Sequence, residues 1–225
     1  MALILGIETS VKTCSVALSK DGDLIALKEI TETDFSHSEK LHGFIASLFE
    51  NSNYKMLDLE AVAVSKGPGS YTGLRIGVSA AKGLCYGLDI PLIGVSTLEA
   101  MQVALREKDT EFYVPMIDAR RMEVFSAVFD TDLKRVNNDE ALLIDADSFH
   151  DLLEANTISF FGNGAAKCKE IIQHDNAVFI DDFTPSAAAV NQLAEKAYLQ
   201  TKFEDIAYFE PFYLKEVFFA QKKKA

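Results

Sequence analysis

The hydrophobic and polar positions in the first part of the chain follow two periods, and each change of period marks a predicted element. Apolar, β-branched runs predict strands over residues 2–8, 14–18 and 24–30, with polar turns at 9–13 and 20–23. After Ser36, a helix is predicted, because apolar residues recur every three or four positions: Leu41, Phe44, Ile45, Leu48 and Phe49. Ser36 and Glu39 have the spacing of a capping box at its start, and the polar cluster 51–53 ends it.

Residues 61–101 are the stretch around which the rest of the chain is organised. The pattern predicts a buried strand at 61–65, a glycine-rich loop at 67–73, a helix to about residue 88 and a second strand at 92–96. Strand, loop, helix and strand form a βαβ unit. A further helix, capped by Thr97, is predicted from 98 to about 108. The predicted order of this first half is βββαβαβα.

The helix that follows the glycine loop is apolar around most of its circumference. At about 100° per residue, its small residues fall on one face: Gly73, Gly77, Ala80, Gly83 and Gly87. Each glycine costs about 1 kcal/mol of helix propensity relative to alanine, so we expect close packing to offset that cost. The periodicity leaves open whether the close neighbour is another part of this chain or another subunit.

The pattern restarts after a charged junction at 106–111. Strands are predicted at 113–118, at 122–129 and onward to 144, followed by helices at 148–154, 165–174 and 186–201 that alternate with strands at 158–161 and 177–180. This order is a degenerate copy of the first half. We therefore expect two lobes, 1–108 and 109–225, with the last helix and the tail as candidates for packing back on the first lobe.

The composition narrows the class of protein. A net charge of −12 argues against a stand-alone nucleic-acid binder, which needs a basic surface. The three cysteines are widely spaced and fit neither a disulfide framework nor a metal motif, so we expect a reducing cytoplasm. No apolar run reaches the roughly 18 residues of a membrane span. The apolar start lacks the basic region of a signal peptide.

The glycine loop invites a phosphate-binding interpretation that its spacing does not support. The dinucleotide fingerprint needs glycine where the chain has Thr72, and the P-loop needs lysine where it has Leu74. A turn with close packing is favoured instead. His37 and His42 are five residues apart, whereas helical zinc pairs use a spacing of four. Both are expected at the surface or the helix cap, and no metal site or catalytic residue is predicted.

Polar residues at two predicted turns are candidate ligand contacts. Glu8, Thr9 and Ser10 follow the first strand; together with Gly162 and Gly164 of a later loop they are weak candidates for a nucleotide site. A tight hairpin tip carries four charges that either contact an anion or a partner, or neutralise one another: Asp118, Arg120, Arg121 and Glu123.

Several segments, in order along the chain, resemble one family. ILGIETS at 4–10, CSVAL at 14–18, HSE at 37–39, GPGSYTGLRIG at 67–77, GVSTL at 94–98 and DARRMEV at 118–124 are similar to the TsaB (YeaZ) family. The likeness is strong over about residues 1–130 and weak beyond, mainly at 211–215. It implies an α/β fold of the actin-like ATPase (ASKHA, ribonuclease H-like) class, with two similar lobes of mixed sheet and helices.

The resemblance also implies a role. It points to a non-catalytic subunit of the complex that transfers threonylcarbamoyl to N6 of the adenosine adjacent to the tRNA anticodon. The implied partners are the catalytic subunit TsaD and the ATPase subunit TsaE, with ATP or ADP and a metal in those subunits, no cofactor in this chain, and tRNA reached only through the complex. The expected contact surface lies on the first lobe: Leu41, Phe44, Ile45, Gly73, Arg75, Gly77, Ala80, Gly83 and Gly87. We expect a homodimer through the same surface when the chain is alone.

Two other functions stay open on the sequence. An ATP-dependent small-molecule kinase of the same fold would use Glu8 and the glycine loops, although its first turn, 9–13, contains neither glycine nor aspartate. A metallopeptidase would need a metal site, which His37 and His42 do not offer at their spacing.

Overall fold

The computed structural model describes residues 2–32, 36–105 and 109–215. Its first sheet has the order β3-β2-β1-β4-β5 and is built from β1 (Leu3–Glu8), β2 (Thr13–Lys20), β3 (Asp23–Thr31), β4 (Ala61–Gly67) and β5 (Leu92–Ser96). β1 runs antiparallel to β2 and parallel to β4, which is parallel to β5. The three opening antiparallel strands and the βαβ unit are confirmed.

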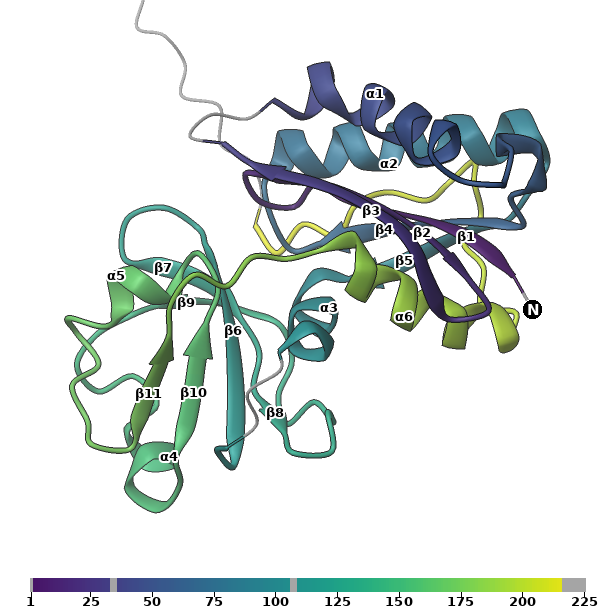
Figure 1. Cartoon of the computed structure of the whole chain (residues 1–225). Helices are drawn as coiled ribbons and strands as arrows, with labels where there is room; N and C mark the ends of the chain where they lie inside the picture. The colour runs from purple at the N-terminus through teal and green to yellow at the C-terminus, as the bar shows by residue number, and fades with distance from the viewer. Residues whose placement is uncertain (1, 33–35, 106–108, 216–225) are drawn as a thin grey trace, which may run out of the picture.

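Helices cover both faces of this sheet (Figure 1). α1 (His37–Glu50) and α2 (Tyr71–Leu88) lie on its outer face, and α3 (Thr97–Ala104) and α6 (Ala187–Leu199) lie on the opposite face. Alternate side chains of β1 serve the two layers: Leu5 and Ile7 join the cluster under α1 and α2, while Ile4 packs with Val190 of α6. Because β1 is buried on both faces, its sequence is an almost continuous apolar run. A short 3-10 helix, η1 (Met56–Asp58), precedes β4.

A second sheet repeats the strand order of the first. It has the order β11-β10-β6-β7-β9 and is built from β6 (Phe112–Asp118), β7 (Glu123–Ser126), β9 (Glu140–Leu143), β10 (Ile158–Phe161) and β11 (Ala177–Ile180), with β8 (Phe129–Asp130) paired to β6. β6 takes the place of β1, antiparallel to β7 and parallel to β10. Its helices α4 (His150–Ala155) and α5 (Ala165–Cys168) are short. The predicted α/β fold with two similar lobes of mixed sheet and helices is confirmed.

α6 comes late in the chain but packs on the first sheet. The side-chain amide of Asn191 donates hydrogen bonds to the carbonyls of Ile4 and Ala17. A Cβ atom at Gly6 would lie 2.4 Å from Asn191 Oδ1, so only glycine allows β1 and α6 to approach this closely.

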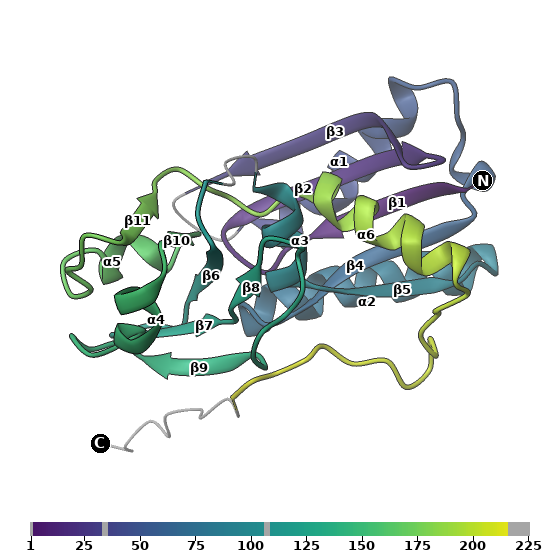
Figure 2. The same cartoon turned by 90° about the horizontal axis from the view of Figure 1, so that it is seen from below.

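The residues after α6 also return to the first lobe. We call 203–215 the C-terminal segment; it runs along the β5 edge of the first sheet (Figure 2). Glu204 forms a β-bridge with Leu92, and the Phe212 N–H donates to the Lys66 carbonyl at 2.7 Å. The Lys82 ammonium on α2 donates to the carbonyl of Phe209 at 3.0 Å. These contacts fix the segment along the edge strand β5 and the adjoining helix.

Some predicted boundaries are corrected. Ser36 makes no side-chain cap; its carbonyl accepts from the Glu39 N–H at 3.1 Å instead. Ser96 rather than Thr97 caps α3. The helix expected over 165–174 is only α5, and the strand region expected up to 144 is limited to β8 and β9. The predicted end of the helix after 98, at about 108, and the basic tail 221–224 lie outside the described residues.

Candidate functional site

A groove of about 690 Å³ runs between α1 and α2 on the outer face of the first lobe. We call it the α1–α2 groove, and its lining comes from both helices: Ser38, His42, Tyr71, Thr72, Arg75, Ile76, Ser79, Ala80, Gly83 and Leu84. Arg75 Nη1 donates to the Tyr71 hydroxyl at 2.6 Å, and its guanidinium lies 5.1 Å from the centre of that ring. Tyr213 of the C-terminal segment also packs on Tyr71, with ring centroids 5.0 Å apart. The groove therefore has an aromatic and cationic end.

The small-residue face of α2 divides into two parts. A Cβ atom on Gly73 would lie 2.2 Å from the Thr9 carbonyl oxygen, and one on Gly77 would lie 2.3 Å from Thr9 Oγ1. Gly73 and Gly77 are therefore internal packing positions, and their assignment to a partner surface is wrong. Apart from the adjoining turns of α2 itself, a Cβ atom on Gly83 or Gly87 would meet no described atom within 4 Å, and both residues are exposed. Only this second part is open to another chain.

The α1 residues of the expected surface divide in the same way. Leu41 is 0% exposed and Ile45 is 2% exposed, and both belong to the core cluster beneath the helix. Their assignment to the partner surface is wrong, because the stripe faces the sheet of their own lobe. Phe44 is half-buried, with the Lys28 ammonium 5.6 Å from its ring centre. Ala80 is buried at the floor of the α1–α2 groove.

Two exposed residues of α2 were missed as candidates. Ser79 lines the α1–α2 groove, and Tyr86 is 84% exposed. Both share with Arg75 the narrow polar arc of α2. This arc, and not the small-residue face as a whole, was the signal that could have identified them.

The turn after β1 is closed. Glu8, Thr9 and Ser10 are all buried, Glu8 Oε1 accepts from the Ser10 N–H at 2.6 Å, and the Thr9 hydroxyl donates to the Gly73 carbonyl at 2.8 Å. Burial raises the pKa of the Glu8 carboxyl, and hydrogen bonds to Ser10 oppose that rise. A Cβ atom on Gly69 would lie 2.6 Å from the Ser10 carbonyl oxygen. The glycine loop thus serves close packing, as its spacing predicted.

Two N–H groups at the start of α2 already have partners within the chain. The Ser70 N–H donates to the Ser10 carbonyl at 2.6 Å, and the Gly73 N–H donates to Ser70 Oγ at 3.3 Å. Since a phosphate at a helix N-terminus needs such N–H groups, this arrangement disfavours a phosphate cradle there.

Gly162 and Gly164 lie against the end of β6 in the second lobe. A Cβ atom on Gly162 would lie 2.5 Å from the Met116 carbonyl oxygen, and one on Gly164 would lie 3.0 Å from the Asp118 nitrogen. Gly162 has φ of 103°, which favours glycine. Among the described residues, no hydrogen bond joins these glycines to Glu8, Thr9 or Ser10. These candidates thus make packing contacts in two separate turns, and a nucleotide site formed by them stays a prediction.

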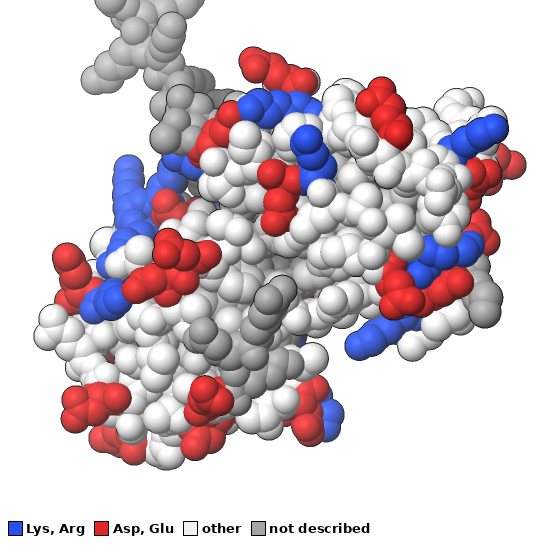
Figure 3. All heavy atoms as spheres, in the orientation of Figure 1, with Lys and Arg blue, Asp and Glu red and all other residues white. Residues whose placement is uncertain are grey.

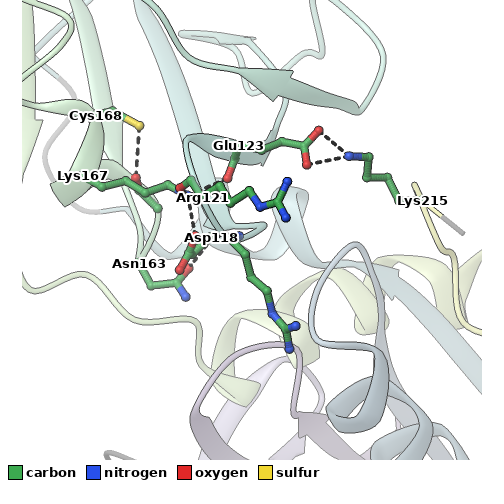
Figure 4. Close-up of polar contacts among 9 residues, drawn as sticks. Asp118, Arg121, Glu123, Asn163, Lys167, Cys168 and Lys215 are labelled. Atoms are coloured by element: carbon green, nitrogen blue, oxygen red, sulfur yellow. Dashed lines mark hydrogen bonds and ion pairs between the residues drawn. The ribbon is translucent and has the colours of Figure 1, made fainter. Parts of the chain in front are cut away.

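The hairpin tip, residues 118–123, is an open and charged turn between β6 and β7 (Figure 4). Lys167 of α5 pairs with the Asp118 carboxylate and donates to the carbonyl of Arg121 at 2.8 Å. Lys215 of the C-terminal segment donates to both carboxylate oxygens of Glu123 at 2.6 Å. The carboxylates of the tip are thus neutralised by lysines from other elements, and the alternative of a self-neutralising turn is wrong.

Among the described residues, the histidines and cysteines form no metal-binding group. His37 is buried, with Nε2 2.8 Å from the Val11 carbonyl oxygen, and burial lowers its pKa; the expectation of a surface or cap position is wrong for it. His42 is exposed in the α1–α2 groove. Burial raises the pKa of Cys14 and of Cys85 to about 11, so neither is a reactive thiol. Within the described ranges, no group of three or more His, Cys, Asp or Glu could hold a metal ion.

The face of the molecule seen in Figure 3 carries no large patch of a single charge. Acidic side chains are spread over both lobes with basic ones dispersed among them. Over the part of the chain that the structure describes, no helix has the length and apolar character needed to cross a bilayer.

Comparison with known proteins identifies relatives over most of the chain. Residues 31–219 match the family model TsaD: tRNA N6-adenosine threonylcarbamoyltransferase. The tRNA threonylcarbamoyladenosine biosynthesis protein TsaB of Haemophilus influenzae is 30% identical over 226 residues, 94% of this chain and 93% of that protein. TsaB of Bacillus subtilis is 35% identical over 76% of this chain and 75% of that protein. TsaB of Escherichia coli is 38% identical over 57% of this chain and 55% of that protein.

Solved structures agree on the fold. YeaZ from Pseudomonas aeruginosa has a TM-score of 0.79 at 24% identity, with 95% of this chain and 100% of that chain covered. A second Pseudomonas aeruginosa structure, described as similar to peptidase YEAZ, has a TM-score of 0.81 at 24% identity, over 96% and 100% of the two chains. The relatives favour threonylcarbamoyladenosine biosynthesis over the kinase and metallopeptidase alternatives. The chain belongs to the TsaB family of tRNA threonylcarbamoyladenosine biosynthesis proteins.

Proposed function

We propose that this chain is the accessory subunit of the complex that transfers threonylcarbamoyl to N6 of the adenosine beside the tRNA anticodon, and that it docks on the catalytic subunit through the α1–α2 groove. The groove itself is the observation that carries the proposal. Its floor contains Ala80 and Gly83, and a helix of another chain approaches closely where side chains are this small. Arg75 and Tyr71 supply the anchoring residue types of interface centres at one end.

The partners and their cofactors are part of the same proposal. The catalytic subunit TsaD occupies the groove, the ATPase subunit TsaE joins the pair, and ATP or ADP and a metal are held by those subunits in the cytoplasm. The buried turn after β1 and the internal hydrogen bonds of the Ser70 and Gly73 N–H groups support placing the nucleotide elsewhere. When the catalytic subunit is absent, a second copy of this chain occupies the groove.

Two substitutions test the groove. Gly83→Leu fills it without an internal clash, because a Cβ atom there meets no described atom within 4 Å. Arg75→Glu reverses the charge at its aromatic end. We expect each to weaken binding of the catalytic subunit by about tenfold or more, measured by calorimetric titration and co-elution. Lys134→Glu is the matched control, because Lys134 is an exposed cation of the second lobe (75% side-chain exposure). Full affinity in both groove variants, with unchanged thermal melting, would contradict the docking surface.

A further inference from the structure

The hairpin tip presents two arginines that the chain leaves without a counter-charge. Arg120 and Arg121 are both exposed. The two carboxylates beside them are taken by Lys167 and Lys215. Among the described residues, neither guanidinium has a hydrogen bond or ion pair. The tip therefore holds four cationic groups against two carboxylates, in a chain whose net charge is −12.

The backbone beneath these arginines is held in place from several sides. The Arg120 N–H donates to Asp118 Oδ1 at 2.9 Å, and the Glu123 N–H donates to the Arg120 carbonyl at 3.1 Å. Lys167 donates to the Glu123 carbonyl at 2.6 Å. Arg120 and Arg121 have φ of 72° and 50°, a left-handed conformation that is uncommon outside glycine. Figure 4 shows Lys167 reaching into the turn, while Lys215 approaches Glu123 from the C-terminal segment.

The chemistry of the tip favours one class of ligand. A planar guanidinium matches the two free oxygens of a phosphodiester, and two adjacent ones span successive phosphates. The tip residues lie outside the lining of three well-formed grooves elsewhere on the described residues, whereas small-molecule sites are usually concave. An open cationic turn therefore suits an extended polyanion better than an enclosed nucleotide. Because the chain is acidic overall, it repels a polyanion over most of its surface and attracts it where positive charge is uncompensated.

We propose that the hairpin tip binds backbone phosphates of the RNA substrate through Arg120 and Arg121. This inference rests on the proposed function, which supplies tRNA as the substrate of the complex. In the assembled complex, Lys167 and Lys215 act as positioning residues, because they occupy Asp118 and Glu123 and leave the guanidiniums to the phosphates.

The test uses the full chain bound to the catalytic subunit and measures tRNA binding between 50 and 200 mM NaCl. For the double variant Arg120→Ala/Arg121→Ala we expect about tenfold weaker binding and a salt slope that is smaller by about 1.5, because two phosphate contacts are lost. Arg120→Lys/Arg121→Lys keeps the charges, so most of the salt slope is expected to remain. Lys169→Ala is the matched control, since Lys169 is an exposed cation that already pairs with Asp181.

Co-elution with the catalytic subunit, measured on the same samples, separates this inference from the proposed function. An intact complex whose tRNA affinity and salt slope are unchanged in the double alanine variant would overturn the inference alone. Loss of co-elution in that variant would show that the tip is a protein contact and would also overturn it. If the unmodified chain does not bind the catalytic subunit, the proposed function is overturned. The inference about the hairpin tip, which rests on that function, is then overturned with it.

Discussion

The turns that follow the first strand of each sheet occupy equivalent places, yet one is buried and the other is open. Glu8 ends β1 and Asp118 ends β6. Each carboxylate accepts a hydrogen bond from the N–H two residues later, at 2.6 Å from Ser10 and at 2.9 Å from Arg120. Glu8 is 0% exposed, whereas the Asp118 side chain is 43% exposed. The two turns thus share a local hydrogen-bond geometry but differ in solvent exposure, because the packing around them differs.

The difference comes from the helix that follows the parallel neighbour of each central strand, which is α2 after β4 and α5 after β10. α2 has 18 residues; its Gly73, together with Gly69 of the loop before it, packs against the first turn, so that turn is sealed inside the lobe. α5 has four residues, and it reaches the second turn mainly through the Lys167 side chain. The long helix converts its turn into core and also supplies the wall of the α1–α2 groove. The short helix leaves its turn available to a ligand.

The largest effect is expected where the first turn is sealed. Gly73→Ala places a Cβ atom 2.2 Å from the Thr9 carbonyl oxygen, a backbone atom that cannot move away without opening the turn. We expect a loss of about 3 kcal/mol in the free energy of unfolding, measured by urea denaturation. Gly83→Ala on the same helix is the control, because there a Cβ atom has no described neighbour within 4 Å. This control is expected to gain up to about 1 kcal/mol from helix propensity. Equal effects in the two variants would break the distinction.

The glycines of α2 also show how much of the structure could be predicted from the sequence. The helical period placed Gly73, Gly77, Gly83 and Gly87 near one face and predicted close packing, which is right for the first two. It could not name the neighbour, since Gly73 meets Thr9 from 64 residues away in the chain. The order of strands and helices along the chain, and its repeat in the second half, followed from local patterns. Contacts between distant segments did not.

The prediction for the hairpin tip was limited in the same way, because it could not include contacts from distant parts of the chain. Its four charges were read from adjacent residues, but their partners lie far along the chain: Lys167 is 49 residues from Asp118 and Lys215 is 92 residues from Glu123. The arginines stand uncompensated only because these lysines arrive from other elements. A local reading therefore left two alternatives, and tertiary structure chose between them.

The next effect concerns pH. Burial raises the pKa of Glu8 above its usual value of 4.5, so the folded chain holds this proton more tightly than the unfolded chain does. The stabilisation that the protonated Glu8 carboxyl gives is complete below its pKa in the unfolded chain. This stabilisation is lost as pH rises through the pKa of Glu8 in the folded chain. Glu8→Gln stays neutral and still accepts from Ser10. We expect the free energy of unfolding of this variant to exceed that of the wild type by about 1–3 kcal/mol at pH 8. The difference is expected to shrink toward pH 4, as measured by urea titrations.

Asp118→Asn is the matched change in the open turn. It removes the carboxylate that pairs with Lys167, so a small loss of stability at pH 8 is expected in place of a gain. A gain in both variants, or a pH-independent effect of Glu8→Gln, would mean that the two turns do not differ in the way their burial indicates.

A smaller loss is expected when the open turn loses its internal clamp. Lys167→Ala removes the ion pair with Asp118 and donors to two tip carbonyls, and the side chain is 23% exposed. We expect destabilisation by about 1 kcal/mol in urea unfolding, together with faster amide exchange at 119–122. Lys169→Ala, which breaks a surface pair with Asp181, should change stability by less than about 0.5 kcal/mol. Unchanged exchange at the tip would indicate that Lys167 does not hold it.

The smallest effect is expected from the other lysine. Lys215 pairs with Glu123 at 2.6 Å, but its side chain is 53% exposed, so solvent and salt screen the pair. We expect Lys215→Ala to change stability by about 0–0.5 kcal/mol, with no difference from wild type in 1 M NaCl, by urea unfolding at both salt concentrations. Its consequence lies in charge and not in stability: Glu123 is released, so the net positive charge at the tip falls. A Lys215→Ala loss as large as that of Lys167→Ala would instead place the C-terminal segment among the structural supports of the second turn.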